Sequence, residues 1–190
     1  IKETKKHEIV SVSFKTSSED FDSDGIKNAD VVIDFTSPAA ILGNIEKVST
    51  LGKNMVVGTT GWYDKLDKVK KLVNDAGIGL IYAQNFSIGA NIFFSLVASA
   101  AKLASELSDY DIYGLEIHHK GKKDSPSGTA LKTAELILSN SKRKKTLQTE
   151  KLDRQINDEE LNFVSIRAGR NTGFHQVVYD SDEDSITLSN

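Results

Sequence analysis

The chain has 190 residues, no cysteine and a formal net charge of −3, which allows one large domain or two small ones and excludes disulfide bonds and thiol chemistry. Its composition, 38% hydrophobic and 27% charged, is typical of an ordinary globular protein. No apolar run approaches the roughly 20 residues of a membrane helix, and no signal peptide is visible at the start. We therefore expect a cytoplasmic protein.

Residues 9–14 alternate apolar with mostly small side chains, which predicts a short strand. Residues 1–8 look like the end of a charged helix, and the first residue is Ile1, so we expect the sequence to begin inside a longer chain. Lys15 follows the strand, where dinucleotide-binding folds read the adenosine ribose and an acidic residue favours NAD. Lys15 therefore indicates NADPH, unless it is simply a solvent-exposed strand end.

The next part of the chain alternates short strands and helices. Residues 29–35 form a continuous apolar run, as strands buried on both faces of a parallel sheet do. Further strands are predicted over 54–57 and 79–83, with helices after Pro38 and over 63–76. This order predicts right-handed crossovers and a doubly wound, Rossmann-like α/β sheet. Ligands of such sheets bind at the carboxyl ends of the strands, which here carry Asp34, Phe35, Thr36, Gly58, Thr59 and Thr60.

Residues 84–91 are polar and contain glycine, and they break this rhythm. We therefore place a domain junction there, between a first domain over 1–86 and a second over 87–190. The longest apolar pattern follows over 92–107 and predicts a core helix that Asn91 caps.

The remainder of the second domain is predicted to contain a mixed sheet. Residues 139–160 are polar and are expected to form an exposed excursion. Their basic run over 142–145 lacks the wide basic surface and nearby aromatic residues of a nucleic-acid site, so no nucleic-acid partner is expected. The strands of this sheet are predicted over 110–117, 161–168, 173–179 and 185–189.

The stretch from Glu116 to Ala130 gathers most of the groups capable of chemistry. Its fifteen residues include two of the four histidines, three lysines and two carboxylates. A helix predicted over 130–138 leaves the amides of Gly128 and Thr129 unpaired at its N-terminus, where anions bind. Positive charge surrounds this place, on His118, His119, Lys120, Lys122 and Lys123. The pattern indicates a small, multiply anionic ligand.

Two other interpretations of this stretch need to be weighed. It could be a solvated loop in which Ser127 only caps the helix, a contribution of about 1 kcal/mol. A zinc site is disfavoured, because adjacent histidines on a strand point to opposite faces, cysteine is absent, and only His7 and His175 remain as further imidazoles. No metal is predicted.

The motif resembles the signature of the 4-hydroxy-tetrahydrodipicolinate reductase family, the nicotinamide-dependent enzymes of lysine and diaminopimelate biosynthesis. The matching residues are Glu116, His118, His119, Lys122, Asp124, Pro126, Ser127, Gly128, Thr129 and Ala130. Three further segments agree in order and spacing, over 32–36, 57–61 and 85–91. A later pair of segments, over 166–169 and 173–175, fits less closely.

The resemblance implies a cofactor domain, NADPH or NADH as cofactor, and a second α+β domain that binds a dicarboxylate and forms a homotetramer. It implies that His118 donates a proton to the reduced substrate and that Lys122 assists as a second acid. His119, Lys122, Gly128 and Thr129 would hold the substrate carboxylates. Cofactor contacts are implied for Lys15, Phe35, Thr36, Gly58, Thr59, Thr60, Ala83, Gln84, Asn85 and Phe86.

The sequence departs from the family pattern at both ends. It has no glycine-rich turn of the kind that holds a cofactor pyrophosphate, and it lacks the C-terminal helical segment of the family, so we expect truncation. Two rival functions stay open. One is another nicotinamide-dependent dehydrogenase, for homoserine or a semialdehyde, and the other is a non-catalytic anion-binding module without its cofactor loop.

Overall fold

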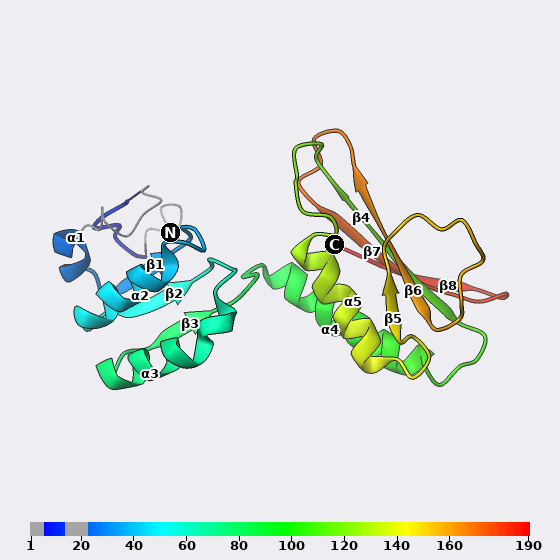
Figure 1. The fold of residues 1–190 in the computed structure, drawn as a ribbon, viewed down its shortest axis with the longest axis horizontal. Coiled ribbons are helices and arrows are strands. Elements are labelled where there is room, and N and C mark those ends of the chain that lie inside the picture. The colour runs from blue at the N-terminus through cyan, green and yellow to red at the C-terminus, as the bar shows by residue number, and fades with distance from the viewer. Residues whose placement is uncertain (1–5, 14–22) are drawn as a thin grey trace. The chain divides into compact units, whose positions relative to one another are not determined.

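The computed structural model describes residues 6–13 and 23–190 (Figure 1). The chain divides into two compact units, Ile1–Phe86 and Ser87–Asn190. No helix in the described ranges is long and apolar enough to cross a membrane.

The first unit contains a parallel sheet of three strands in the order β1, β2, β3. These strands are β1 (Val31–Asp34), β2 (Asn54–Val57) and β3 (Leu80–Tyr82). The helices of this unit are α1 (Ser23–Lys27), α2 (Ile41–Thr50), the 3-10 turn η2 (Tyr63–Lys65) and α3 (Leu66–Ala76). The predicted strand and helix order is confirmed here, and the left-handed Gly77 ends α3 with φ of 65°.

The core of the first unit lies between its sheet and the apolar faces of α2 and α3. Helical spacing places Ile41, Ile45 and Val48 on one face of α2, where they are buried. They pack in one cluster with Met55, Val57, Trp62, Val69 and Val73. This packing fixes the ends of β1 and β2, which carry the predicted ligand contacts.

Three expectations for the first unit are wrong. Residues 9–13 form no strand and belong to neither sheet, and residues 6–8 are not helical. Residues 6–13 and β1 both line a cavity of about 980 Å³. Val31 and Ile33 border it and are 46% and 50% exposed, so β1 is not buried on both faces. Lys15 lies outside the described residues.

The second unit contains a mixed sheet of five strands in the order β5, β6, β4, β7, β8, which confirms the predicted α+β architecture. Its strands are β4 (Asp111–His118), β5 (Thr146–Gln148), β6 (Glu160–Arg167), β7 (Phe174–Asp180) and β8 (Ser185–Ser189). The central strand β4 runs parallel to β6 and antiparallel to β7. Two helices, α4 (Ile88–Ala104) and α5 (Gly128–Asn140), pack together beside this sheet (Figure 1).

Alternation along the strands gives this sheet two different faces. The face toward α4 and α5 holds the core, which includes Val97, Ile137 and Phe163. Gly114 lies on this face, and a Cβ there would come 2.4 Å from the Phe163 ring. The opposite face is apolar and partly exposed, with Tyr113, Val164 and Ile166 between 38% and 45% exposed.

Three details of the second unit correct the sequence predictions. Helix α4 begins one turn earlier than expected, and Ser87, not Asn91, caps it by accepting a hydrogen bond from the amide of Ala90. Only one face of α4 belongs to the core, since Ile92 and Leu96 on its other face are 56% and 51% exposed. The excursion over 139–160 contains the edge strand β5.

Lys144 explains part of that excursion. Its side chain is only 3% exposed, and its ammonium pairs with Asp111 at 2.5 Å and donates to the Glu160 carbonyl at 2.8 Å. One member of the predicted solvated basic run therefore holds the excursion against β4 and β6.

Candidate active site

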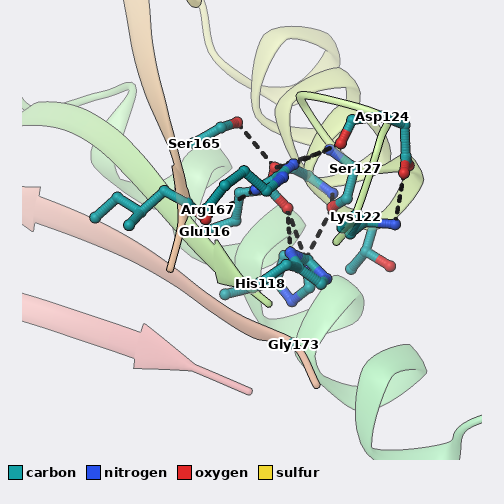
Figure 2. A network of polar contacts seen from close by, with 12 residues as sticks. Glu116, His118, Lys122, Asp124, Ser127, Ser165, Arg167 and Gly173 are labelled. Atoms are coloured by element: carbon teal, nitrogen blue, oxygen red, sulfur yellow. Dashed lines mark hydrogen bonds and ion pairs between the residues drawn. The ribbon is translucent and has the colours of Figure 1, made fainter. Parts of the chain in front are cut away.

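The register of the second sheet assembles a polar cluster at the carboxyl end of β4. Glu116 has Ser165 of β6 on one side and His175 of β7 on the other, and His118 lies opposite Arg167 of β6. Because paired residues point to the same face of a sheet, all five side chains face the side that α5 covers. Figure 2 shows Ser165, Arg167 and Ser127 converging on Glu116.

Glu116 is the centre of this cluster and is fully buried. Its Oε1 accepts hydrogen bonds from the Ser127 amide at 2.8 Å, the Ser165 hydroxyl at 2.8 Å and the Arg167 guanidinium at 2.7 Å. Burial raises the pKa of this carboxyl, but the hydrogen bonds from Ser127, Arg167 and Ser165 outweigh burial and lower it to about 2. Glu116 is therefore an anion at neutral pH.

Two imidazoles face the second oxygen of this carboxylate. His118 Nδ1 lies 2.9 Å from Glu116 Oε2, and His175 Nε2 lies 3.6 Å from the same atom. Burial lowers the pKa of His118, while the Glu116 charge opposes that effect. Burial lowers the pKa of His175 further, to about 4. His175 is consequently neutral at pH 7, and its Nε2 lies 3.2 Å from the Ser127 hydroxyl.

The N-terminus of α5 closes the cluster on its other side. The Ser127 hydroxyl accepts from the Ala130 amide at 3.1 Å, so Ser127 caps the helix as predicted. It does more than cap, because its own amide binds Glu116 and its hydroxyl lies beside His175. A Cβ at Gly128 would meet nothing within 4 Å. The helix start therefore has open space beside it, at its positive end.

The remaining predicted substrate residues surround this helix start. Lys122 pairs with Asp124 at 2.8 Å in the loop between β4 and α5, and Thr129 is half-buried in the first turn of α5. His119 is exposed, and its amide donates to the Asn171 carbonyl at 2.7 Å. The structure thus brings His118, Lys122, Gly128 and Thr129 to one end of the sheet. His119 directly follows the end of β4 and is exposed there.

Sequence reasoning missed four members of the cluster. Glu116 was recognised only as part of the motif, and Ser165, Arg167 and His175 were given no role. A signal was present for Glu116, because residues i and i+2 of a strand share a face and Glu116 therefore accompanies His118. The other three lie 49 to 59 residues beyond Glu116 in the chain, and only the strand pairing reveals them.

The cluster also contains a set of donors that a metal could use. One ligand atom from each of Glu116, His118 and His175 lies within 4.8 Å of the others. Cations already occupy its surroundings, however, because Arg167 is bonded to Glu116 and Lys122 adds a second positive charge near both imidazoles. These positive charges disfavour a metal cation at the same place.

The first unit has a comparable arrangement at the carboxyl edge of its sheet. Asp34, which is 5% exposed, accepts from the Thr36 amide and hydroxyl and from the Thr59 hydroxyl at 2.8 to 3.0 Å. Its second oxygen accepts from Asn44 of α2 at 2.8 Å. One buried carboxylate thus joins the loops that follow β1 and β2. Sequence reasoning missed this role of Asp34 and Asn44.

The predicted cofactor contacts of the described residues lie along this edge or just after β3. The Gly58 amide donates to the Asp34 carbonyl at 2.9 Å, and a Cβ at Gly58 would come 2.1 Å from the Phe35 ring. The Ala83 amide continues the sheet by donating to the Val57 carbonyl at 3.2 Å. Phe35 is 66% exposed and contacts Phe86 edge to face, with ring centroids 6.3 Å apart. Thr60 and Gln84 are exposed and Asn85 is half-buried.

Comparison with known proteins decides the family. The model for the dihydrodipicolinate reductase N-terminus matches residues 2–86, and the model for its C-terminus matches residues 89–190. The chain belongs to the dihydrodipicolinate reductase family. It is 37% identical over 163 residues to the 4-hydroxy-tetrahydrodipicolinate reductase of Methanococcus aeolicus, and 36% identical over 183 residues to that of Methanococcus maripaludis.

A solved structure of the family is also similar. It is a dipicolinate-bound dihydrodipicolinate reductase from Paenisporosarcina sp. TG-14, with 25% identity and a TM-score of 0.65. The alignment covers 85% of this chain and 61% of that one. The Methanococcus alignments cover 84% and 95% of this chain but only 59% and 67% of the reductases. The chain therefore spans about three fifths to two thirds of the length of its relatives.

The buried, neutral His175 makes a prediction for the pH dependence of stability. An unfolded histidine has a pKa of about 6.5, whereas the pKa of folded His175 is about 4. Between these values the unfolded chain binds more protons, so the free energy of unfolding falls as the pH is lowered. His175→Gln should make this loss less steep between pH 6.5 and 5, by up to about 1.4 kcal/mol per pH unit.

Urea unfolding at a series of pH values measures this slope. The measurements stay above pH 4.5, because below that value the protonation of Glu116 in the unfolded chain also changes the free energy of unfolding. Above pH 7.5 the slopes of the natural chain and the variant should agree, because His175 is then neutral in both the folded and the unfolded state. Equal slopes below pH 6.5 would show that His175 is protonated normally in the folded protein.

Proposed function

We propose that this chain acts in the reduction of 4-hydroxy-tetrahydrodipicolinate to tetrahydrodipicolinate with NADPH or NADH, in lysine and diaminopimelate biosynthesis. The observation that carries the proposal is the position of His118. A buried imidazole, backed by an ionised carboxylate, lies at the same end of β4 as the open N-terminus of α5. Membership of the reductase family supports the same function.

The helix start and the basic loop suit a substrate with two carboxylates. Free amides at Gly128 and Thr129 and the helix dipole favour an anion, and the empty space at Gly128 lets one approach the backbone. Lys122 supplies a positive charge from the loop, and His119 supplies a hydrogen-bond donor. The dipicolinate bound to the Paenisporosarcina reductase is a planar dicarboxylate of this kind.

His118 suits the role of proton donor to the reduced substrate. NADPH or NADH, when bound, supplies the hydride that adds to the unsaturated ring. The electron-rich carbon that results takes a proton from His118 Nε2, and Lys122 assists as a second acid. Histidine can do this near neutral pH because both of its protonation states are accessible there.

The carboxyl edge of the first sheet is our proposed cofactor site. Phe35, Thr36, Gly58 and Thr59 are held together there by Asp34. Thr60, Ala83, Gln84, Asn85 and Phe86 complete the proposed contacts. The preference for NADPH over NADH is a separate proposal that rests on Lys15. We also propose that the reaction takes place in the cytoplasm.

A homotetramer is the proposed assembly, and the apolar outer face of the second sheet supports self-association. Apolar side chains are spread over neighbouring strands there, which is unusual for a surface exposed to water. The members of this outer face are Tyr113, Leu115, Ile117, Val164, Ile166, Phe174 and Val178.

Ligand binding tests the function most directly. We expect calorimetric titration of the full natural chain to show binding of both a nicotinamide cofactor and pyridine-2,6-dicarboxylate, with NADPH favoured over NADH if Lys15 reads the ribose. Binding of the dicarboxylate alone would favour the rival function, an anion-binding module without cofactor. A failure to bind either ligand would contradict the proposal.

Substitution of the two proposed acids tests the mechanism. His118→Gln and Lys122→Ala in the full natural chain should lower the turnover number by about 100-fold or more, the usual contribution of a general acid. Lys132→Ala provides a matched control, because Lys132 lies on α5 and pairs only with Glu135 among the described residues. Turnover within a few-fold of the natural chain for either variant would show that the residue is not an acid in this reaction.

The assembly is tested by placing a charge on the outer face. Val164→Lys should reduce the sedimentation coefficient of the full natural chain to that of a smaller assembly, because a buried unpaired charge is costly. Ser139→Lys, at an exposed position of α5 and therefore on the other side of the sheet, is the control. An unchanged sedimentation coefficient for Val164→Lys would place the subunit contacts elsewhere.

A further inference from the structure

We propose that Glu116 is the positioning residue for His118: it fixes the imidazole through Nδ1 and leaves Nε2 as the edge from which the proton is donated. This inference rests on the proposed function, which gives His118 its role, but it assigns a new role to a residue that does not touch the substrate. Its basis is the contact geometry of one buried carboxylate.

The first step is that Glu116 cannot move freely. A buried charge is tolerated only when hydrogen bonds compensate for the water it has lost. Three donors on Oε1 provide this compensation, and they come from the start of α5 and from two positions of β6. The carboxylate is thus anchored from two elements that are remote in sequence, and its orientation is set by the fold.

The second step concerns the other oxygen. Glu116 Oε2 and His118 Nδ1 lie 2.9 Å apart as an ion pair without a well-aligned hydrogen bond, and neither atom has a hydrogen bond to any other described residue. A carboxylate only accepts hydrogen bonds. The Nδ1 atom must therefore carry a hydrogen to use this contact, and in the neutral imidazole Nε2 is then without one.

The third step is the surroundings of the Nε2 edge. Gly173, in the turn before β7, lies beside this edge, and a Cβ there would come 3.1 Å from Nε2 (Figure 2). Any side chain at this position would crowd the nitrogen that we assign to proton donation. Glu116 therefore contacts the imidazole at Nδ1, and Gly173 leaves space at Nε2 on the opposite edge of the ring.

The charges around His118 decide what the loss of Glu116 would do. The charged and titratable groups that act on it are Glu116 on its own strand, His175 on β7, Arg167 on β6, and Lys122 and Asp124 in the loop. Burial and the two cations disfavour the imidazolium, and Glu116 is the largest effect that favours it. Without this anion, a smaller fraction of His118 would be protonated, and fewer molecules could donate a proton to the substrate.

The test combines a spectroscopic measurement on the full natural chain with kinetics of variants. Nitrogen-15 NMR of the His118 ring should show the hydrogen on Nδ1 in the neutral form. Neutral His118 with its hydrogen on Nε2 would overturn the proposal directly, without any variant and without any turnover. The NMR result also separates this inference from the function, since it does not depend on the reaction.

The kinetic part uses Glu116→Gln, which keeps the shape and removes the charge. We expect the turnover number to fall about 10- to 100-fold, with a smaller change in KM, because the acid is misplaced and less often protonated. A required acid loses activity as the pH rises through its pKa, so the decline in rate should begin at a lower pH in this variant. Glu116→Asp keeps the charge and should keep the position of that decline more closely.

Glu135→Gln is the matched control. Glu135 lies on the exposed side of α5 with 64% of its side chain exposed, and it pairs with Lys132, so its variant should retain both rate and pH profile. If Glu116→Gln turned over like the natural chain and kept the pH profile, the positioning role would be wrong while the proposed function stood. If Glu116→Gln failed to fold, Glu116→Asp and the NMR measurement would still decide the question.

Discussion

The second unit depends on one buried charge that must be neutralised. Glu116 has no exposed surface, and an ionised carboxylate in such a place is tolerated only with several donors directed at it. Its partners among the described residues come from the start of α5, from strand β6 and from the two imidazoles. The same contacts that stabilise the anion therefore set where the helix begins and which way His118 faces. Stability and chemistry are linked at this residue.

The first unit uses a buried carboxylate in a similar way. Asp34 lies at the end of β1 and accepts hydrogen bonds from Thr36, Thr59 and Asn44. It closes the loops after β1 and β2 against each other, and Gly58 leaves room for the Phe35 ring. In both units the sheet ends in a carboxylate that holds irregular backbone in place. Loops held in this way can present amides and hydroxyls to a ligand with little loss of conformational entropy on binding.

The sequence was sufficient wherever the signal was local. Period-two alternation predicted β4 and its buried face, and helical spacing with a serine cap predicted α5. The predictions failed where a distant partner decides the outcome. Residues 9–14 have the composition of a strand, but a strand forms only within a sheet, and residues 9–13 belong to neither sheet of the structure. In the same way, Ser165, Arg167 and His175 could not be assigned to the site, because the register of β4 with β6 and β7 brings them there.

Three of the four histidines show how position within the fold separates identical side chains. His118 and His119 are neighbours in sequence, yet the pleat places one against Glu116 and leaves the other exposed. His118 and His175 face the same carboxylate oxygen, but His175 is 3.6 Å away and lies against Ser127, whereas His118 is 2.9 Å away. Burial lowers the pKa of both imidazoles and the Glu116 charge opposes it at both, and the pKa of the more distant His175 falls to about 4. One carboxylate therefore faces two imidazoles in different settings: His175 lies against Ser127 as a neutral group, and His118 is the one to which we propose an acid role.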